Sequence, residues 1–194
     1  MEKDSTKLTG FISYTRKDQE HVDALREMLE NQFTIDGEKY ELWSDLEIGL
    51  GTKWRDEIFQ NLKETDFSLL FLSNNFLATD FIRKEELPRF IERNEENQPY
   101  AIIPVLLKPC QFARFKYLED LQVFVPRGSE LGLKDNSPIS FSHAYKEGSP
   151  IIDNYIIALF DKINNRLVKV LQEKAKLYGE DKARSSPPKT KWLW

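Results

Sequence analysis

The fold is decided by residues 66–91, DFSLLFLSNNFLATDFIRKEELPRFI. The stretch opens with a short apolar run, Phe67–Leu72, that lies between two patterns typical of helices. Such a run predicts a parallel strand that is buried on both faces of a sheet. Ser73, Asn74 and Asn75 follow, and their side chains can cap a helix or form a turn. We therefore expect a strand, a loop and a helix in succession.

Two adjacent carboxylates, Glu85 and Glu86, lie near the end of this stretch. In a helix, the residues four positions before and after Glu86 are Ile82 and Phe90, so its face is apolar. Glu85 has Arg89 four residues on, which places Glu85 on the solvent side. The pattern predicts that Glu86 is the carboxylate in an apolar setting.

Pro88 affects how this helix begins. Proline suits the first helical position and moves the preceding residue away from α geometry. A new or kinked helical turn is therefore expected at Pro88, with Glu86 near its N-terminal end. Because Glu86 is late in a strand–loop–helix unit, we expect it near the carboxyl edge of the sheet. Open α/β folds bind their ligands at that edge.

The remaining chain continues the alternation of strands and helices. Apolar runs predict further strands at residues 8–14, 40–43, 100–107 and 123–125, and helical spacing predicts helices around residues 22–29, 54–62 and 152–170. Pro104 within the fourth run indicates a bulge or an edge position. Residues 126–150 are expected to form a surface loop. The fold class predicted is α/β, a flavodoxin-like three-layer sandwich around a five-stranded parallel sheet.

Composition narrows the function. The chain has 194 residues, a net charge of −4 and no basic cluster, so nucleic acid is not expected as a partner. No apolar run is long enough to span a bilayer, and MEKDSTK at the N-terminus is not a secretion signal, so we expect a cytoplasmic protein. The single cysteine, Cys110, is interpreted as structural, and no metal or cofactor is expected. We expect one domain over residues 1–178, with a core at about 8–170, and a linker at 179–194 that leads to a further domain or partner.

Three motifs resemble one family in order and spacing. FISYTRKD at residues 11–18 resembles the first box of the TIR (Toll/interleukin-1 receptor) domain. LWSDLEIGLGTKWRDEI at residues 42–58 resembles its second box and BB loop. LFLSNNFLATDFIRKEELP at residues 70–88 is similar to the third strand and the following helical region of bacterial members. The resemblance covers about residues 8–170.

This resemblance implies a flavodoxin-like domain that self-associates with other TIR domains. Many members also hydrolyse NAD⁺ as a substrate, releasing nicotinamide and leaving ADP-ribose or a cyclic relative. The family's essential glutamate follows an aromatic residue and directly precedes Leu or Ile, which here implies Glu86 before Leu87. Phe81 is four residues before Glu85 and five before Glu86, so the register between the two glutamates stays open. The apolar flanks and the Glu-Leu ending favour Glu86.

Cleavage of the nicotinamide–ribose bond explains why such a site needs a carboxylate. The sugar develops positive charge, as in glycoside hydrolysis, while the leaving nicotinamide is neutral and needs no general acid. A carboxylate stabilises that charge better in a dry pocket than in water. The resemblance implies further substrate-binding residues: Phe81 or Trp54 on the nicotinamide, Arg16 on the pyrophosphate, Tyr14 or Ser73 on the floor, and Asp45 in the BB loop.

Each of these residues also has a plainer interpretation. Trp54 begins an i, i+4, i+8 apolar stripe that already explains it as a core residue. Arg16 suits a solvated loop, Asp45 suits a loop cap, and Glu86 on its own suits an exposed helix. The plainer interpretation is favoured for Trp54 and Asp45, the two are balanced for Arg16, and for Glu86 the plainer one would prevail without the resemblance.

We therefore expect an NAD⁺ glycohydrolase in bacterial defence that is activated by self-assembly. The alternative is a non-catalytic TIR adaptor that acts only through contacts with other TIR domains. A flavodoxin-like module that receives a phosphoryl group is disfavoured, because FISYTRKD offers only Asp18 where such modules need clustered acids.

Overall fold

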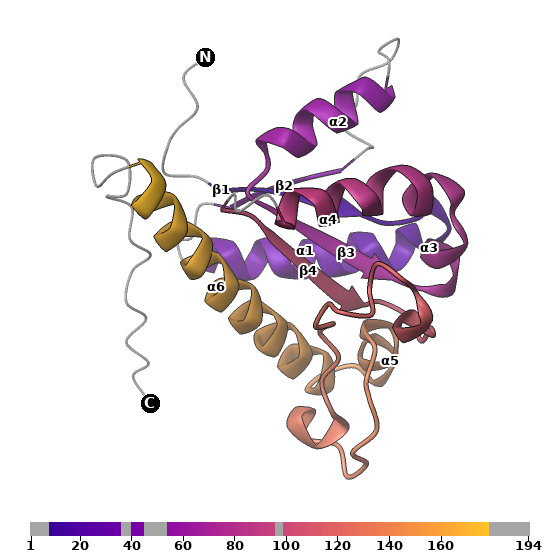
Figure 1. Ribbon diagram of the computed structural model, residues 1–194. Coiled ribbons are helices and arrows are strands. Elements are labelled where there is room, and N and C mark those ends of the chain that lie inside the picture. The colour runs from indigo at the N-terminus through magenta and orange to yellow at the C-terminus, as the bar shows by residue number, and fades with distance from the viewer. Residues whose placement is uncertain (1–7, 36–39, 45–53, 96–98, 179–194) are drawn as a thin grey trace.

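The computed structural model describes residues 8–35, 40–44, 54–95 and 99–178, which form a parallel sheet between two layers of helices (Figure 1). The strands are β1 (Leu8–Ser13), β2 (Tyr40–Trp43), β3 (Phe67–Leu72) and β4 (Ala101–Leu106). Their order is β2-β1-β3-β4, and every pair is parallel. This order equals the first four positions of the flavodoxin-like arrangement.

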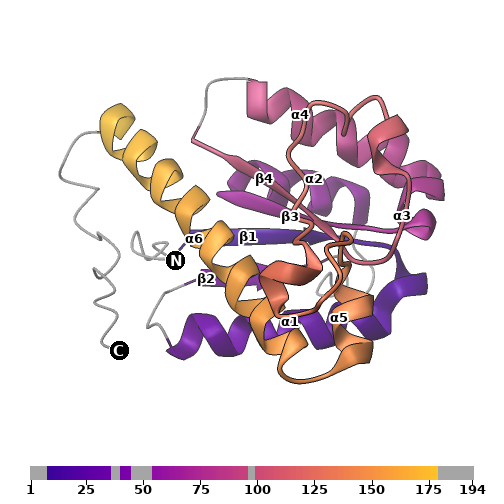
Figure 2. The same cartoon turned by 90° about the horizontal axis from the view of Figure 1, so that it is seen from below.

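Helices cover both faces of the sheet. The helical segments are η1 (Arg16–Asp18), α1 (Gln19–Ile35), α2 (Trp54–Glu64), α3 (Asn74–Ala78), the π-helical η3 (Ile82–Glu86), α4 (Leu87–Glu95), η4 (Phe112–Arg114), η5 (Gly128–Leu131), α5 (Phe141–Glu147) and α6 (Ile151–Tyr178). Figure 2 shows α1, α5 and α6 on one side of the sheet and α2, α3 and α4 on the other. Each layer has its own apolar core against the sheet.

Strand β3 carries both cores, as its continuous apolar sequence predicts. Phe67, Leu69 and Phe71 pack into the core on the α1 side, and Leu70 and Leu72 pack into the core on the α4 side. All five side chains are fully buried. Burial of each side chain stabilises the fold by about 1.5–3 kcal/mol. The prediction of a strand buried on both faces is confirmed.

The prediction of a fifth strand at residues 123–125 is wrong, because the segment makes only an isolated bridge. Phe124 pairs with Val105 by donating to the Pro104 carbonyl at 2.7 Å and accepting from Leu106 at 3.1 Å. To extend the bridge, a parallel ladder would need two further backbone hydrogen bonds. The N–H of residue 104 would donate the bond before the bridge, and the N–H of residue 126 the bond after it, but both residues are prolines. Neither proline has an N–H, so the ladder stops at one bridge.

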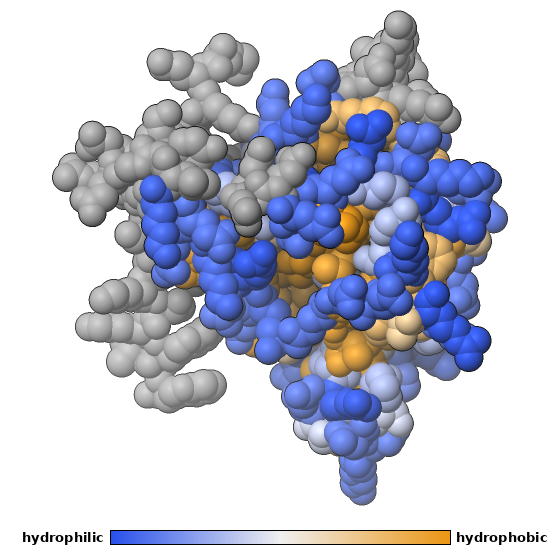
Figure 3. Space-filling model, viewed as in Figure 1, coloured by the Kyte–Doolittle hydropathy of each residue, from blue (hydrophilic) through white to orange (hydrophobic). Residues whose placement is uncertain are grey.

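Strand β4 is therefore an edge strand of the four-stranded sheet, and the predicted edge position of Pro104 is confirmed. Figure 3 shows apolar atoms between α6 and α4, where β4 lies, surrounded by hydrophilic side chains.

The surface loop predicted for residues 126–150 contains two helical segments that the sequence analysis missed, η5 and α5. Ser140 caps α5 by accepting from the His143 amide at 3.3 Å, and Gly148 ends it with a φ of 74°. Phe141 and Ala144 of α5 are fully buried. The Ser cap and the terminal Gly were the signals available in the sequence.

Two expectations lie outside the described residues. The BB loop at residues 45–53 is one, and the expected linker at 179–194 is the other. Within the described part of the chain, none of the helices combines the length and apolar character needed to cross a bilayer.

Gly10 provides a stability test of the sheet. A Cβ at Gly10 would lie 2.3 Å from Phe67 Cζ and 2.9 Å from Leu42 Cδ2, both in the buried core. We expect Gly10→Ala to lower the free energy of unfolding by about 1–3 kcal/mol in urea titrations, because overpacking forces the ring to move. In a Phe67→Leu background the same change should cost less. An equal cost in both backgrounds would contradict the contact.

Candidate functional site

Glu86 lies buried at the carboxyl end of β1. Its exposed fraction is 5%, and its Oε2 accepts a hydrogen bond of 2.6 Å from Ser13 Oγ. Ser13 is the last residue of β1 and is 1% exposed. The hydrogen bond therefore joins the end of a central strand to a residue 73 positions later in the chain.

The local backbone explains why Glu86 points inward. It ends the π-helical segment Ile82–Glu86, and α4 begins at the next residue, whose N–H donates to the Ile82 carbonyl. Pro88 has no N–H for the Lys84 carbonyl, so regular α pairing cannot run through this point. Ile82, Leu87 and Phe90 are buried in the same core, whereas Glu85 is partly exposed. The predicted contrast between the two glutamates and the change of helix beside Pro88 are confirmed.

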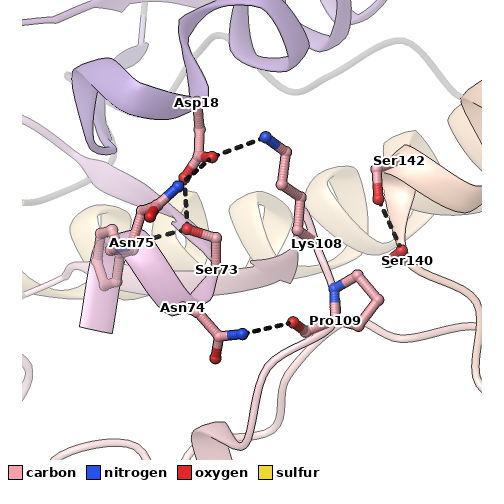
Figure 4. Close-up of polar contacts among 9 residues, drawn as sticks. Asp18, Ser73, Asn74, Asn75, Lys108, Pro109, Ser140 and Ser142 are labelled. Atoms are coloured by element: carbon pink, nitrogen blue, oxygen red, sulfur yellow. Dashed lines mark hydrogen bonds and ion pairs between the residues drawn. The ribbon is translucent and has the colours of Figure 1, made fainter. Parts of the chain in front are cut away.

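A second buried carboxylate, Asp18, lies at the same edge of the sheet (Figure 4). Its side chain has an exposed fraction of 0% and accepts a hydrogen bond from Ser73 Oγ. Asn75 Nδ2 donates to Asp18 Oδ1 at 3.1 Å, and Lys108 Nζ donates to the same oxygen at 2.8 Å. We call Asp18, Ser73, Asn75 and Lys108 the Asp18 cluster.

Asp18 is held in its ionised form. Burial acts to raise the pKa of Asp18, but the hydrogen bonds from Lys108, Ser73 and Asn75 outweigh it and hold the pKa below the ordinary 3.8. Lys108 supplies the opposite charge and keeps 30% of its side chain exposed. The cluster is therefore a charge-assisted hydrogen-bond network.

Ser73 was predicted both as a helix cap and as a floor residue. It caps α3 by accepting from the Phe76 amide at 3.0 Å, which confirms the cap. Its hydroxyl also donates to Asp18, and the side chain is 1% exposed. Ser73 thus belongs to the Asp18 cluster.

Tyr14 and Arg16 follow β1 at the carboxyl end of the strand. Tyr14 is half-buried, packs against the core on the α1 side, and donates to Gln19 Oε1 at 2.9 Å. Arg16 is exposed at the start of η1.

Phe81 precedes the π-helical segment and is half-buried. Its ring stacks with Phe59 of α2 at a centroid distance of 6.4 Å and an interplanar angle of 23°. The Arg89 guanidinium lies 3.7 Å from the centre of the Phe59 ring. These contacts tie α2 to the segment that carries Glu86.

Trp54 begins α2, but its side chain lies outside the described part of the structure, as does the whole of Asp45. Cys110 is half-buried, and burial raises the pKa of its thiol to about 11. The thiolate, which is the nucleophilic form, is disfavoured at neutral pH. In the described ranges, no group of His, Cys, Asp and Glu side chains is arranged to hold a metal ion.

Sequence reasoning missed four residues of this edge: Ser13, Asp18, Asn75 and Lys108. Each of them ends a strand or follows one within a few residues. Because the carboxyl ends of parallel strands meet at one edge, that position was the available signal. The sequence could not predict which of these residues pair with one another, since Asp18 and Lys108 are 90 residues apart.

The fold and this edge define a parallel α/β domain of the class that binds ligands where its strands end. The family model for the TIR domain matches residues 11–130, more than half of the chain, and the chain belongs to the TIR domain family. The chain is also 30% identical over 104 residues to the "Uncharacterized protein y4lF" of Sinorhizobium fredii. The match covers 53% of this chain and 31% of that protein, so the chain spans about a third of its relative. No solved structure gives a significant match.

The lowered pKa of Asp18 predicts an acid-sensitive contribution to stability. A carboxyl whose pKa is lower when folded stabilises the fold above its unfolded pKa and loses this effect as the pH falls through the folded pKa. At pH 7 we expect Asp18→Asn to reduce the free energy of unfolding by about 1–3 kcal/mol. In urea titrations the difference from wild type should shrink from about pH 4 downward. If wild type and Asp18→Asn differed by the same free energy of unfolding at pH 7 and below about pH 4, the lowered pKa of Asp18 would be contradicted.

Proposed function

We propose that this TIR domain cleaves the nicotinamide–ribose bond of NAD⁺, with Glu86 as the catalytic residue. The observation that carries the proposal is the burial of Glu86 at the carboxyl edge of the sheet, with Ser13 bonded to it at 2.6 Å. Membership in a family that includes NAD⁺-hydrolysing members supports it. The products are nicotinamide and ADP-ribose or a cyclic relative.

The chemistry suits a single sheltered carboxylate. The bond between the anomeric carbon and the nicotinamide nitrogen breaks, and its electron pair leaves with the neutral base. Glu86 stabilises the positive charge on the sugar and accepts hydrogen bonds from ribose hydroxyls. Water then adds to the anomeric carbon and loses a proton. When a hydroxyl of the same nucleotide or its adenine nitrogen adds instead, the product is cyclic.

Other residues are proposed to bind the rest of the substrate. Arg16 is exposed in the segment after β1, which supports a contact with the pyrophosphate. Phe81 and Trp54 remain the proposed aromatic wall for the nicotinamide, and Asp45 the proposed BB-loop acid. Tyr14 and Ser73 remain the proposed residues of the floor, where their hydroxyls are bonded to Gln19 and Asp18.

We propose that the domain works in the cytoplasm in bacterial defence and is activated by self-association. TIR domains often engage one another, and a neighbouring copy could then complete the site. The linker expected at residues 179–194 would connect the domain to a sensor.

Glu86→Gln tests the catalytic assignment. The amide keeps the size of the side chain but removes the negative charge, so we expect nicotinamide release to fall by more than about 100-fold. Chromatography of NAD⁺ incubated with concentrated or artificially clustered protein measures it. Glu85→Gln, on the neighbouring residue, is the matched control and should retain activity.

Loss in Glu85→Gln with retention in Glu86→Gln would move the catalytic role to Glu85. No release by the wild type under any clustering condition, with self-association intact, would leave the adaptor function instead.

Ser13→Ala tests the hydrogen bond to Glu86. A hydrogen bond to a charged group contributes about 1.5–3 kcal/mol, so kcat should fall about 10- to 100-fold. Ser68→Ala is a matched control, because Ser68 is a fully buried strand serine that accepts from Tyr100 Oη at 2.7 Å. It should lower the melting temperature while kcat stays near the wild-type value. Equal kcat losses in both variants would contradict a specific role for Ser13.

A further inference from the structure

The Asp18 cluster connects three segments that end at the same edge of the sheet. Asp18 closes the η1 turn after β1, where its N–H donates to the Thr15 carbonyl at 2.8 Å. Ser73 and Asn75 begin α3, and Lys108 follows β4. One buried carboxylate thus holds the turn after β1, the start of α3 and the turn after β4 in fixed positions.

Two of these three segments lead directly to the Ser13–Glu86 hydrogen bond. The turn that Asp18 closes begins after Ser13, which is the donor. The helix that Ser73 and Asn75 begin, α3, ends at Ala78, and the chain then leads through Thr79 into the π-helical segment that ends at Glu86, the acceptor. Thr79 connects the two parts of that path, since its Oγ1 donates to the Asn75 carbonyl at 2.9 Å and its carbonyl accepts from the Arg83 amide at 3.1 Å.

We propose that Asp18 is a positioning residue for Glu86, and the proposal rests on the proposed function. Asp18 sets the separation between the end of β1 and the segment that carries Glu86, and so holds the carboxylate in its reactive orientation. Charge-assisted hydrogen bonds are short and directional, which suits this task. A buried ion pair often contributes little net stability compared with an apolar replacement, which suits a role in positioning.

The chain offers a matched control at the opposite edge of the same sheet. Asp66 directly precedes β3, is 7% exposed, pairs with Lys174 and accepts from the Thr9 amide at 2.9 Å. Asp18 and Asp66 are therefore both buried, lysine-paired carboxylates, but only Asp18 lies at the edge that holds Glu86. A role confined to stability would give both residues similar effects.

The experiment compares wild type, Asp18→Asn and Asp66→Asn in the full chain. The ¹³C carboxyl signal of Glu86, assigned with Glu86→Gln, is recorded at fixed pH, and kcat and KM for NAD⁺ are measured on clustered protein. We expect Asp18→Asn to move the Glu86 signal and to lower kcat about tenfold or more, with KM changed less than about twofold. Asp66→Asn should lower the melting temperature but leave the signal and kcat near wild type.

An unmoved Glu86 signal in Asp18→Asn, or equal kcat losses in both variants, would overturn the proposal. If wild type releases no nicotinamide, the proposed function fails, while the Glu86 signal still decides the positioning role. If Asp18→Asn does not fold, Asn75→Ala and Lys108→Met replace it under the same criteria. Lys108→Arg keeps the charge and should restore part of the kcat that Lys108→Met loses.

Discussion

Burying the carboxylate of Glu86 is the constraint on which the rest of this edge depends. A carboxyl group taken out of water is costly unless the protein supplies hydrogen bonds to it. Ser13 supplies one, and it can do so only because β1 ends beside the π-helical segment. The surrounding apolar side chains, such as Ile82 and Phe90, keep water away and strengthen the interaction. Strand end, helix geometry and core packing therefore act together on one side chain.

Prolines shape both the site and the sheet through the N–H groups that they lack. Pro88 interrupts helical pairing just after Glu86, where the π-helical segment gives way to α4. Pro104 and Pro126 limit the contact of residues 123–125 with β4 to one bridge. The sheet therefore ends at β4. Lys108 lies in the turn that follows this edge strand. Its ammonium group reaches back to Asp18 from there.

Local features of this protein were predictable from its sequence, and pairings across the chain were not. The limits of Phe67–Leu72, the cap at Ser73 and the sheltered side of Glu86 all follow from neighbours within four residues. The Asp18–Lys108 pair spans 90 residues and depends on strand order, which no local pattern encodes. The prediction of a fifth strand at residues 123–125 was wrong because it too depends on a pairing between distant segments. Its apolar residues suggested pairing, but the missing donors are found in two separate segments, at Pro104 and Pro126.

Two pairs of a buried aspartate and a lysine join distant segments of the chain, one where the strands end and one where β3 begins. Asp66–Lys174 joins the start of β3 to α6 across 108 residues, and Asp18–Lys108 joins the end of β1 to the end of β4. Contacts of such long sequence separation require the closure of long loops, which costs conformational entropy. The edge that carries Glu86 is complete only with β4 in the sheet, because Lys108, which pairs with Asp18, follows β4. A buried carboxylate held at this edge therefore depends on segments that run from β1 to the turn after β4.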